Sequence, residues 1–515
     1  AGSKIPAAVA VVNPHRKEYT GTDQNLCGAG VALKLVSALE HGDDAQALET
    51  FGVLAAIATI GDIVPMTPEN RSLVKLGLEQ LPNTDNLGLQ ALMEVAGLQG
   101  KPLTAQKIAF GIVPRINAAG RMGSAKLAVE LLLSEDEERA LQLAQKIDEL
   151  NQKRREEEEA ILCRIQEKIQ ENPSMLFDRV MVVASENMNH GVVGIVSSRL
   201  LTLYGKPNII LSVDGDYATG SARSIGYFSL FQALTACAEY LPKYGGHRLA
   251  AGMTVKTVDI PNFSKAINQY AATEYDKMPI AEQQIDKELH IADICVEDIA
   301  ALSCLEPFGE GNQPPIFLLR NCLIEELIPL SENKHLKIKV NFEGKNIFVL
   351  YFRMSTDQFI YRVGSQVDIL ANLELNSFRD TVSVAIRLKD IRPAGFNDEK
   401  IGNADYYYQK IRRGESVEAK IMQISVPTVD ELRATYKILR SVSGRKMHVD
   451  LLYLGAFLGK INYCKYRLML DILAELDLIS IAPDFSRIEM KTGTSQVNLE
   501  TSQILKGLRK YGSSN

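Results

Sequence analysis

Three short stretches of this sequence combine hydrogen-bond donors for an oxyanion with glycines that let a ligand approach the backbone. The first, PRINAAGRMG (114–123), places Arg115 and Arg121 on either side of Asn117, just before an expected helix. Arginine binds oxyanions through two parallel hydrogen bonds, so two guanidiniums beside a flexible turn suit phosphate recognition. A pair of ordinary surface salt bridges is the alternative, and this stretch alone does not decide between them.

The second stretch, NMNHGVVGIVSSRL (187–200), places His190 and Gly191 in a loop between an expected strand and an expected helix. Ligands of α/β sheets bind at the carboxyl ends of the strands. The free N–H groups and the positive dipole of a helix N-terminus also favour a phosphate there. A histidine that merely caps the helix is the alternative, and the stretch taken alone favours it.

The third stretch is divided between GSARSI (220–225) and YGGHRLAAGMTV (244–255). Adjacent glycines allow the backbone to come close to a ligand. The candidate ligand-binding residues of the two segments are Arg223, Ser224, Gly245, Gly246 and His247. Two such loops in one α/β domain, both with donors and neither with an acid nearby, predict an oxyanion site.

Two carboxylate-bearing stretches raise the question of a metal. Asp62 follows the apolar run FGVLAAIATIG, and Pro65 comes three residues later, in GDIVP (61–65). An acid at that position is either a helix-end cap or one ligand of a metal ion. VDGDYATG (213–220) also looks like a metal loop, but it lies between two expected strands, and Asp-Gly-Asp is common in turns. It is therefore predicted to be a hairpin turn.

The bulk composition indicates a globular protein of several domains. The chain has 515 residues, of which 46 % are hydrophobic and 23 % charged, and no apolar stretch reaches the roughly 18 residues of a membrane helix. Seven cysteines without a C-x-x-C pair fit a reducing cytoplasm and argue against structural zinc. The net charge is −6, but residues 401–515 carry 17 basic and 12 acidic side chains. That region offers a polyanion a local basic patch, with ordinary surface charge as the alternative.

The elements that must position these candidates begin with an α/β arrangement. Residues 7–14, AAVAVVNP, look like a buried strand closed by a turn, and residues 28–40 and 45–60 look like apolar helices. A capping-box pattern at Ser134 predicts a long helix that ends before Pro173. Its middle segment, NQKRREEEE, is polar on every face, so we expect it to bridge two domains through solvent.

The second half of the chain changes its pattern twice. Residues 179–212 indicate strand, helix and strand, a βαβ unit that opens a second α/β domain. Short strands follow one another closely between about 316 and 392, which predicts a small antiparallel barrel or sandwich. Helices return after residue 404 and, with the strand-like RIEMKT, predict a winged-helix-like module. DEKIGNAD (398–405) is the expected linker.

Taken in order, these stretches resemble the RecJ family, the single-strand-specific DNA exonucleases of the DHH phosphoesterase superfamily. The resemblance spans about residues 5–394, and residues 400–515 look like the extra C-terminal region of some RecJ-like proteins. The matching motifs are VVNPHR (11–16), GDIVP (61–65), GIVPRINAAGRMG (111–123), HGVVGIVSSRL (190–200), GSARSI (220–225), YGGHRLAAG (244–252), EPFGEGNQPPIF (306–317), HLKIKV (335–340) and LELNSFRD (373–380).

The resemblance implies an α/β multidomain fold with its active site in the cleft between the first and third of five parts. The parts would be the C-terminal part of a DHH domain (1–133), a connecting helix (134–172), a DHHA1 domain (173–280), an OB-fold β-barrel (281–394) and a C-terminal RecJ-associated module, helical or winged-helix-like (400–515). The barrel would bind a single strand through a basic groove and stacked aromatic rings. The candidate rings are Phe308, Phe317, Phe348, Tyr351, Phe352 and Phe378.

The resemblance also implies 5′-to-3′ hydrolysis of single-stranded DNA in repair and recombination, with Mn²⁺ or Mg²⁺. By motif match Asp62 would be a metal ligand, and Asp62, His190 and Arg115 would be catalytic. The residues that would hold the scissile phosphate and its neighbours are Asn117, Arg121, Arg223, Ser224, Gly245, Gly246 and His247. The C-terminal module would hold DNA or a protein partner, a single-strand-binding protein or a helicase, and the location would be cytoplasmic.

The sequence departs from the family in two places. The family's other metal ligands come from two acidic runs and an Asp-His-His triad that precede VVNP, and no Asp-His-His occurs here. Those ligands are therefore expected before Ala1, with this chain inactive alone. Asn189 stands where the family usually has an aromatic residue. The alternatives are a DHH-type phosphoesterase for short oligonucleotides or cyclic dinucleotides, and a catalytically dead single-strand-binding scaffold.

Overall fold

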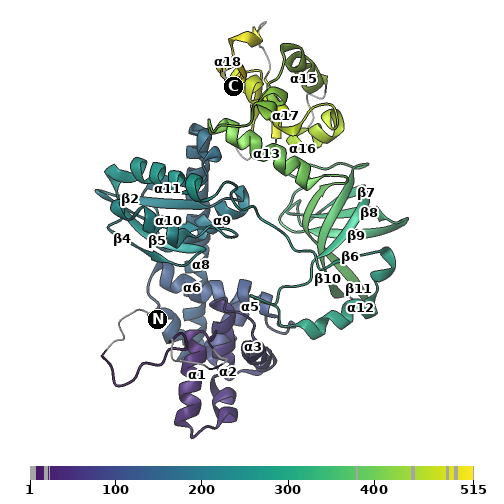
Figure 1. The fold of residues 1–515 in the computed structure, drawn as a ribbon. Coiled ribbons are helices and arrows are strands. Elements are labelled where there is room, and N and C mark those ends of the chain that lie inside the picture. Colours follow the sequence, from purple (N-terminus) through teal and green to yellow (C-terminus); the bar gives the residue numbers. More distant parts are fainter. Residues whose placement is uncertain are drawn as a thin grey trace. The chain divides into compact units, whose positions relative to one another are not determined.

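The chain divides into two compact units. The computed structural model describes residues 7–16, 21, 24–378, 381–441, 447–482, 487–491 and 497–513. The first unit contains residues 1–157, 292–316 and 372–384, and the second contains residues 158–291, 317–371 and 385–515. Figure 1 labels the helices and strands of both units along the chain.

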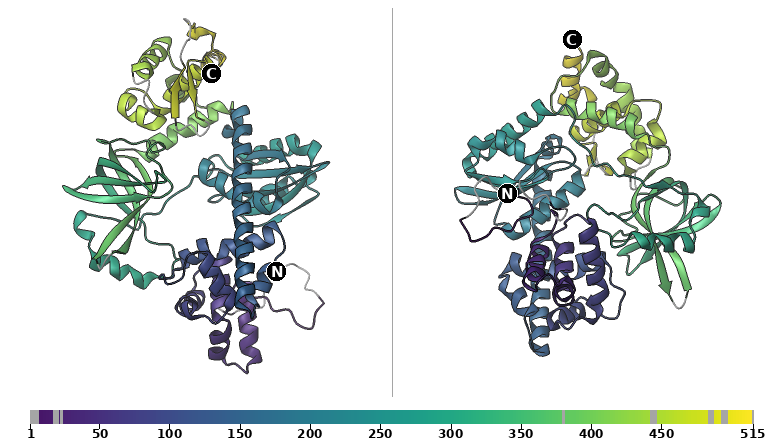
Figure 2. Two further views of the ribbon diagram at one scale, coloured as in Figure 1. Left: turned by 180° about the vertical axis from the view of Figure 1, so that it is seen from behind. Right: turned by 60° about the horizontal axis from the view of Figure 1, so that its bottom comes forward.

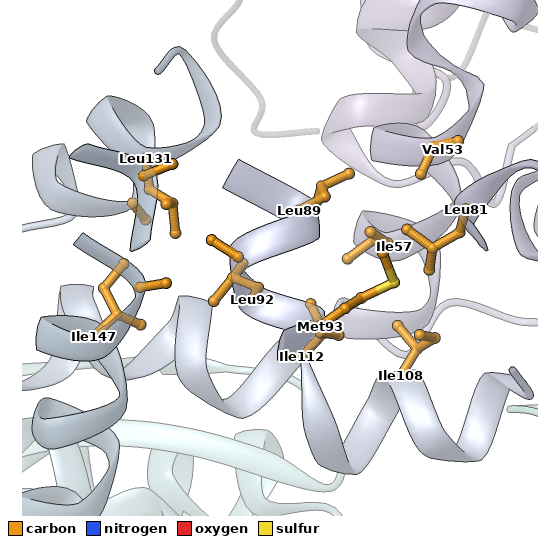
Figure 3. Packing of buried hydrophobic residues seen from close by; sticks show 14 of the residues in the cluster. Val53, Ile57, Leu81, Leu89, Leu92, Met93, Ile108, Ile112, Leu131 and Ile147 are labelled. Carbon is orange, nitrogen blue, oxygen red and sulfur yellow. The ribbon is translucent and has the colours of Figure 1, made fainter. Parts of the chain in front are cut away.

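Up to residue 157 the described part of the first unit consists of helices. Their bounds are α1 (Gly28–Leu39), α2 (Asp44–Gly61), α3 (Pro68–Gln80), η1 (Leu81–Asn83), α4 (Leu87–Val95), α5 (Ala105–Gly111), α6 (Val113–Met122) and α7 (Lys126–Leu132). Side-chain oxygens of Asp43, Asn86 and Thr104 cap three of these helices at their N-termini. Aliphatic side chains such as Leu92 and Ile108, both fully buried, form one core (Figure 3). The two helices predicted at 28–40 and 45–60 are confirmed.

The strand predicted at residues 7–14 is wrong. Residues 7–10 are exposed and have no regular secondary structure. A strand is stable only when its N–H and C=O groups pair with a neighbour, and the described residues up to 157 contain no strand that could pair with it. The turn that was expected to follow is confirmed, because the Asn13 side chain accepts a hydrogen bond from the His15 N–H at 2.8 Å.

A single long helix, α8 (Glu137–Glu171), follows the first core (Figure 2). Its 35 residues correspond to a length of about 52 Å. It begins three residues after the predicted start, because the Asp136 side chain, not that of Ser134, accepts from an N–H of the first turn, that of Arg139. Buried side chains are found on α8 before residue 152 and after residue 160 but not between them, which confirms the polar middle segment.

A five-stranded sheet forms the α/β domain of the second unit, in the order β1-β2-β3-β5-β4. Its elements are β1 (Met181–Glu186), α9 (His190–Tyr204), β2 (Asn208–Asp214), β3 (Tyr217–Arg223), α10 (Leu230–Ala236), β4 (Lys243–Gly246), β5 (Ala250–Lys256) and α11 (Ile260–Glu274). Strands β1 and β2 are parallel and joined by α9, which confirms the predicted βαβ unit. The turn between Asp214 and Tyr217 confirms the predicted hairpin. Helices α10 and α11 pack into one core with the sheet.

A closed barrel follows, built from strands in the order β7-β8-β9-β11-β10 with β10 paired back to β7. The strands are β7 (Phe317–Leu330), β8 (His335–Phe342), β9 (Lys345–Tyr351), β10 (Gln366–Phe378) and β11 (Thr381–Pro393), and a short β6 (Lys287–Glu288) adds to β7. Among the described pairings within this closed ring, that of β9 with β11 is the only parallel one. This is the arrangement of an OB barrel.

The C-terminal module begins with α13 (Asp398–Arg412), which includes the segment 398–405 that was expected to be a linker. That expectation is wrong: Asn397 caps the helix, two acids occupy its first turn, and Ile401 is buried. The other elements are α14 (Ala419–Ser425), α15 (Val429–Ser441), β12 (Met447–His448), α16 (Val449–Leu452), a π-helical segment (Tyr453–Phe457), α17 (Tyr463–Glu475), β13 (Ile479–Ile481), β14 (Arg487–Met490) and α18 (Gln503–Ser513).

The elements from α15 to β14 follow the order of a winged helix, with a small sheet β12-β14-β13. This confirms the winged-helix-like prediction. In the described part of the chain, no helix combines the length and the apolar character needed to cross a bilayer.

Candidate phosphate-binding site and single-strand face

One arginine lies across the face of the α/β sheet beside α9. Arg223, the last residue of β3, donates from Nε to Ser198 Oγ at 3.1 Å and from Nη1 to Ser221 Oγ at 3.1 Å. Its Nη1 also donates to the carbonyl oxygen of Ala222 at 2.9 Å. These bonds fix the guanidinium between the sheet and the helix, so it does not have to be ordered when a ligand arrives.

The helix face that meets Arg223 is set by a spacing of four residues. His190, Gly194 and Ser198 follow one another at this interval on α9 and therefore share one face. A Cβ atom on Gly194 would lie 3.3 Å from Nη2 of Arg223, so this glycine makes room for the guanidinium. His190 is exposed at the first position of the helix, one turn from Gly194.

Asn189, not His190, is the N-cap of α9. Its side chain accepts a hydrogen bond from the Gly191 N–H at 2.8 Å. The alternative of a capping histidine is therefore wrong, and the His190 ring does not have to serve the helix end. The departure from the family at residue 189 thus has a local reason, because asparagine is among the best N-cap residues.

Beside Arg223 the sheet face is bare backbone. Gly245 in β4, Gly252 in β5 and Ser221 in β3 are direct cross-strand neighbours, so they face the same side as Arg223, two residues after Ser221. Both glycines are exposed. Among the described residues, the chain neighbours of each glycine aside, no atom lies within 4 Å of a Cβ built on Gly245, and only the Gly220 carbonyl oxygen, at 3.7 Å, approaches that of Gly252. We call Gly245 and Gly252 the glycine floor.

The loop that joins β4 to β5 lies at the Arg223 end of the sheet, because Ala250 is the partner of Arg223. Gly246 opens this loop with φ +145°, and a Cβ there would lie 2.4 Å from the Ala250 carbonyl oxygen. Only glycine fits that position. The N–H of His247 donates to Ala250 O at 2.8 Å, and the His247 side chain is exposed.

Ser224 has a structural contact. Its side chain is buried, with 4 % of the residue exposed, and its hydroxyl donates to the Phe228 carbonyl oxygen at 2.9 Å. Its N–H donates to the carbonyl oxygen of Leu249 at 2.9 Å, which ties the two loops together. Ser224 therefore supports the loop of His247 while its side chain points into the protein.

In the first unit, the stretch 114–123 is a helix and not the expected turn. Pro114 lies in the first turn of α6, where its fixed φ and missing N–H are tolerated. Nε of Arg115 pairs with Asp148 Oδ1 of α8 at 2.8 Å, and Nη1 donates to the Gly111 carbonyl oxygen at 2.6 Å. Of the two interpretations of Arg115, phosphate recognition and a salt bridge, the structure thus supports the salt bridge. Asn117 and Arg121, one turn apart, share the exposed face of α6.

Asp62 is the C-cap residue of α2, with its N–H donating to the Ala58 carbonyl oxygen at 2.8 Å and its side chain exposed. Its neighbour Gly61 meets α6, because a Cβ there would lie 3.2 Å from a methyl group of Val113. Val113 is one turn before Asn117 on α6. The first unit therefore brings Asp62 close to the exposed face that carries Asn117.

The loop after Asp62 is held by a segment from far along the chain. Met66 N donates to Glu310 O at 2.7 Å, and Arg71 Nη2 donates to the carbonyl oxygens of Cys304 and Glu306 at 2.7 and 2.8 Å. The residues that directly follow GDIVP are therefore in contact with the motif EPFGEGN within the first unit. Their separation in sequence gave no sign of this contact.

The described residues do not by themselves fit a site for two divalent cations. Hard cations need several oxygen ligands, and among the residues that the structure describes no group of three His, Cys, Asp or Glu side chains could hold a metal. Asp62 has an exposed carboxylate and belongs to no such group of three among the described residues. We therefore derive no reaction step through a metal.

The outer face of β8, β9 and β11 carries aromatic rings covered by cations. Lys337 Nζ lies 4.0 Å from the centre of the Phe348 ring, and the Arg387 guanidinium carbon lies 5.1 Å from that of Phe352. His335 meets Phe352 edge-on at 5.3 Å. Phe348 and Phe352 are 44 % and 46 % exposed. In OB barrels this face, formed by the second and third strands, binds nucleic acid. We call these five residues the aromatic–basic face.

The other aromatic candidates of the barrel are placed differently. Phe317 is buried, and Tyr351 and Phe308 are half-buried. The side chain of Phe378 lies outside the described part. Only Phe348 and Phe352 are thus both described and open enough to stack on a base.

Sequence reasoning missed four residues of the sheet site: Gly194, Ser198, Ser221 and Gly252. Two regularities would have found them. The four-residue spacing from His190 points to Gly194 and Ser198, and the two-residue alternation of a strand puts Ser221 on the side of Arg223.

Models of two known domains match the chain. The DHHA1 domain matches residues 174–273, and the RecJ OB domain matches residues 285–390. Among curated proteins, the single-stranded-DNA-specific exonuclease RecJ of Bacillus subtilis is 36 % identical over 395 residues, which cover 76 % of this chain and 49 % of that protein. Its Thermus thermophilus counterpart is 33 % identical over 365 residues, 71 % of this chain and 51 % of that protein.

Solved structures agree with these matches. The crystal structure of Thermus thermophilus RecJ in complex with Mn²⁺ has a TM-score of 0.65 at 30 % identity, covering 77 % of this chain and 57 % of that one. The Mg²⁺ complex has a TM-score of 0.62 at 31 % identity, covering 74 % and 57 %. The chain thus spans about half the length of the curated relatives it matches.

The sheet with its glycine floor is a DHHA1 domain, and the barrel is an OB domain. The chain is therefore a multidomain protein of the class in which a DHHA1 domain is joined to an OB barrel. Within that class, the chain is a homologue of the RecJ proteins named above, and its barrel matches the RecJ OB domain.

Proposed function

We propose that the protein is an exonuclease specific for single-stranded DNA, which hydrolyses phosphodiester bonds from 5′ to 3′ in repair and recombination. The relatives that bear the name single-stranded-DNA-specific exonuclease support this proposal. One observation carries it furthest: the Arg223 guanidinium, fixed by Ser198 and Ser221 at the edge of an exposed glycine floor. This arrangement accepts a phosphate against backbone without displacing any side chain.

The roles proposed for the DHHA1 residues follow from their chemistry. Arg223 donates to a phosphate oxygen, and His247 and His190 donate from their exposed rings. Gly245 and Gly246 admit the strand to the backbone. Ser224, whose hydroxyl already binds the Phe228 carbonyl, acts on the strand only by holding the loop of His247.

In the first unit we propose phosphate contacts for Asn117 and Arg121 and a metal-ligand role for Asp62. Arg115 is the weakest catalytic assignment, since Asp148 and the Gly111 carbonyl already bind its guanidinium. Mn²⁺ or Mg²⁺ is the proposed cofactor, because the RecJ structures from Thermus thermophilus hold these ions. The described residues of this chain supply one candidate ligand, Asp62.

We propose that the aromatic–basic face of the OB domain binds the strand. Bases stack on Phe348 and Phe352 whatever their sequence, and Lys337 and Arg387 move from the rings to the phosphates. Such a face is of no use to an enzyme for dinucleotides, which argues against the short-substrate alternative. A single-strand-binding protein or a helicase is the proposed protein partner, and the cytoplasm the proposed location. The division at residues 133, 172, 280 and 394 is proposed as the domain organisation.

Competition for the single strand tests the binding part of this proposal. The chain is titrated in EDTA with a labelled oligo-dT strand of about 20 nucleotides, and then with unlabelled duplex or dinucleotide as competitor. We expect tight binding of the strand and poor competition by both. Equal competition by duplex would refute single-strand specificity, and efficient competition by dinucleotides would favour the short-substrate alternative. Release of labelled mononucleotides with Mn²⁺, abolished by EDTA, tests the hydrolysis in a RecJ-type chain that also carries the Asp-His-His triad, where it separates an enzyme from a scaffold; this chain alone should release none.

A further inference from the structure

The third helix of the winged-helix-like module is covered by protein. In a helix-turn-helix fold the second helix of the motif enters the major groove, and α17 occupies that place here. From Tyr463 to Leu473, Lys465 is the only residue of α17 that is not buried. One side packs into a core with Tyr453 and Phe457, and the other packs against Met422. A helix buried in this way has no face left for DNA.

Helix α13 provides the polar part of this cover. Tyr408 donates to Asp471 Oδ2 at 2.9 Å, and Arg412 Nε lies 3.4 Å from the same oxygen. From the α17 side, the Arg467 guanidinium lies 4.6 Å from the centre of the Tyr408 ring and 3.8 Å from Asp405. Asp471 and Arg467 are each 8 % exposed. The Arg467 guanidinium, which could bind a phosphate if α17 read DNA, instead contacts α13.

Residues at the end of α13 and just after it also contact the DHHA1 domain. Arg179, next to β1 and only 6 % exposed, donates from Nη2 to both carboxylate oxygens of Glu415 at 3.0 Å. Phe177 belongs to the core of the C-terminal module, where its ring meets Tyr408 edge-on at 5.9 Å and lies 4.6 Å from the Arg412 guanidinium carbon.

Further contacts lie along the same junction. The Tyr406 hydroxyl donates to Asp276 Oδ1 at 2.8 Å. Lys277 Nζ donates to Asn403 Oδ1 at 3.3 Å. The junction therefore combines one charge pair with a buried arginine and a shared aromatic cluster, in addition to exposed polar contacts.

We propose that α13 joins the C-terminal module to the DHHA1 domain as one folding unit, and that the buried face of α17 is an intramolecular docking surface and not a DNA-reading surface. The module then serves to fix the DHHA1 domain, whose β1 leads directly into the loop of His190. This inference does not depend on the nuclease activity, because it concerns the packing of α13 alone.

Hydrogen exchange of the full chain, followed by mass spectrometry, tests the docking. Glu415→Ala leaves the buried Arg179 without its carboxylate, and Glu159→Ala removes the exposed partner of Arg199 as a matched control. In Glu415→Ala we expect exchange to accelerate by about tenfold or more in both β1 and α17, because a buried unpaired charge is costly and the two regions open together. The control and strand β8 should stay unchanged. Acceleration in α17 without any in β1 would overturn the proposal of one folding unit.

The wild-type chain supplies a second test that does not require a variant to fold. Exchange is measured with and without a single strand and a duplex of about 20 nucleotides. We expect protection of β8 and β9 by the single strand and no change at residues 463–475 with either DNA. Protection of α17 by either DNA would overturn its assignment as a docking surface, whether or not the DHHA1 and OB sites bind as proposed.

Discussion

Replacing Arg223 by alanine tests the sheet site most directly. The guanidinium contributes a charged hydrogen-bond donor, and contacts of that kind contribute about 1.5–3 kcal/mol. The affinity for a single strand should therefore fall by roughly 10- to 150-fold at constant salt. The variant should also lose one phosphate contact. For single strands this makes the slope of log affinity against log salt concentration less negative by about 0.7. The Arg223→Lys variant should keep the slope but lose affinity, because an ammonium group cannot bind both Ser198 and Ser221 as the guanidinium does.

Fluorescence anisotropy with labelled oligo-dT at several salt concentrations measures both quantities. Arg199→Ala is the matched control, since Arg199 lies on the same helix and pairs with Glu158 and Glu159 at its exposed surface. Thermal unfolding of each variant checks that the DHHA1 domain is intact, because Arg223 also donates to Ser198 and Ser221. An unchanged salt slope in folded Arg223→Ala would refute the placement of a phosphate at Arg223.

Four further predictions concern the floor, the barrel and the junction. Gly252→Val should reduce single-strand affinity about tenfold, because its side chain would occupy the space above the glycine floor. The melting temperature should not fall, because valine favours strands. Unchanged affinity would contradict the proposal that the strand lies on the glycine floor. Phe348→Ala should cost about 1–3 kcal/mol of binding, and an abasic strand should abolish the difference from wild type if the ring stacks on a base. Phe177→Ala should destabilise the C-terminal module by about 3–5 kcal/mol in urea unfolding; a cost below about 1 kcal/mol would mean that Phe177 is not a core residue. Burial, and then Arg413, lowers the pKa of Lys206 from 10.5 to about 8. Between pH 8 and 10.5 the unfolded chain keeps the Lys206 proton that the folded chain has lost, so the free energy of unfolding rises with pH. The difference in this free energy between wild type and Lys206→Met should therefore increase by up to about 3 kcal/mol across that range. A difference that falls with pH would contradict the buried lysine.

The parts of the site that were predictable from the sequence are those with a local cause. Gly246 is demanded by a φ of +145° within its own loop, and the βαβ unit around His190 follows from apolar runs and their spacing. The partners of Arg223 were not predictable in this way. Ser198 lies 25 residues away on another element, and only the register of the strands and the four-residue repeat of α9 bring it to the guanidinium.

The first unit shows the same limit. The mixture of glycine, asparagine and arginine in residues 114–123 favours a turn by composition, yet Pro114 and the alanines at 118 and 119 make it a helix with buried small residues. Asp148, which pairs with Arg115, is 33 residues further along the chain. A motif therefore pointed to candidate residues, but it could not show whether a guanidinium was already paired.

The mistaken linker at 398–405 shows that a polar and mostly exposed segment can still be the start of a helix. DEKIGNAD has one large apolar residue, Ile401, so the sequence of this segment shows no apolar face that could be buried. Burial raises the pKa of Asp405, while Arg467 and Lys206 act against that effect. Both cations come from other elements, one of them from the DHHA1 domain. A carboxylate loses part of its contact with water only where such partners offset the desolvation cost, and those partners exist only in the folded chain. Polar residues that a local pattern assigns to solvent can therefore be the ones that join two domains, as the polar residues of α13 do at this junction.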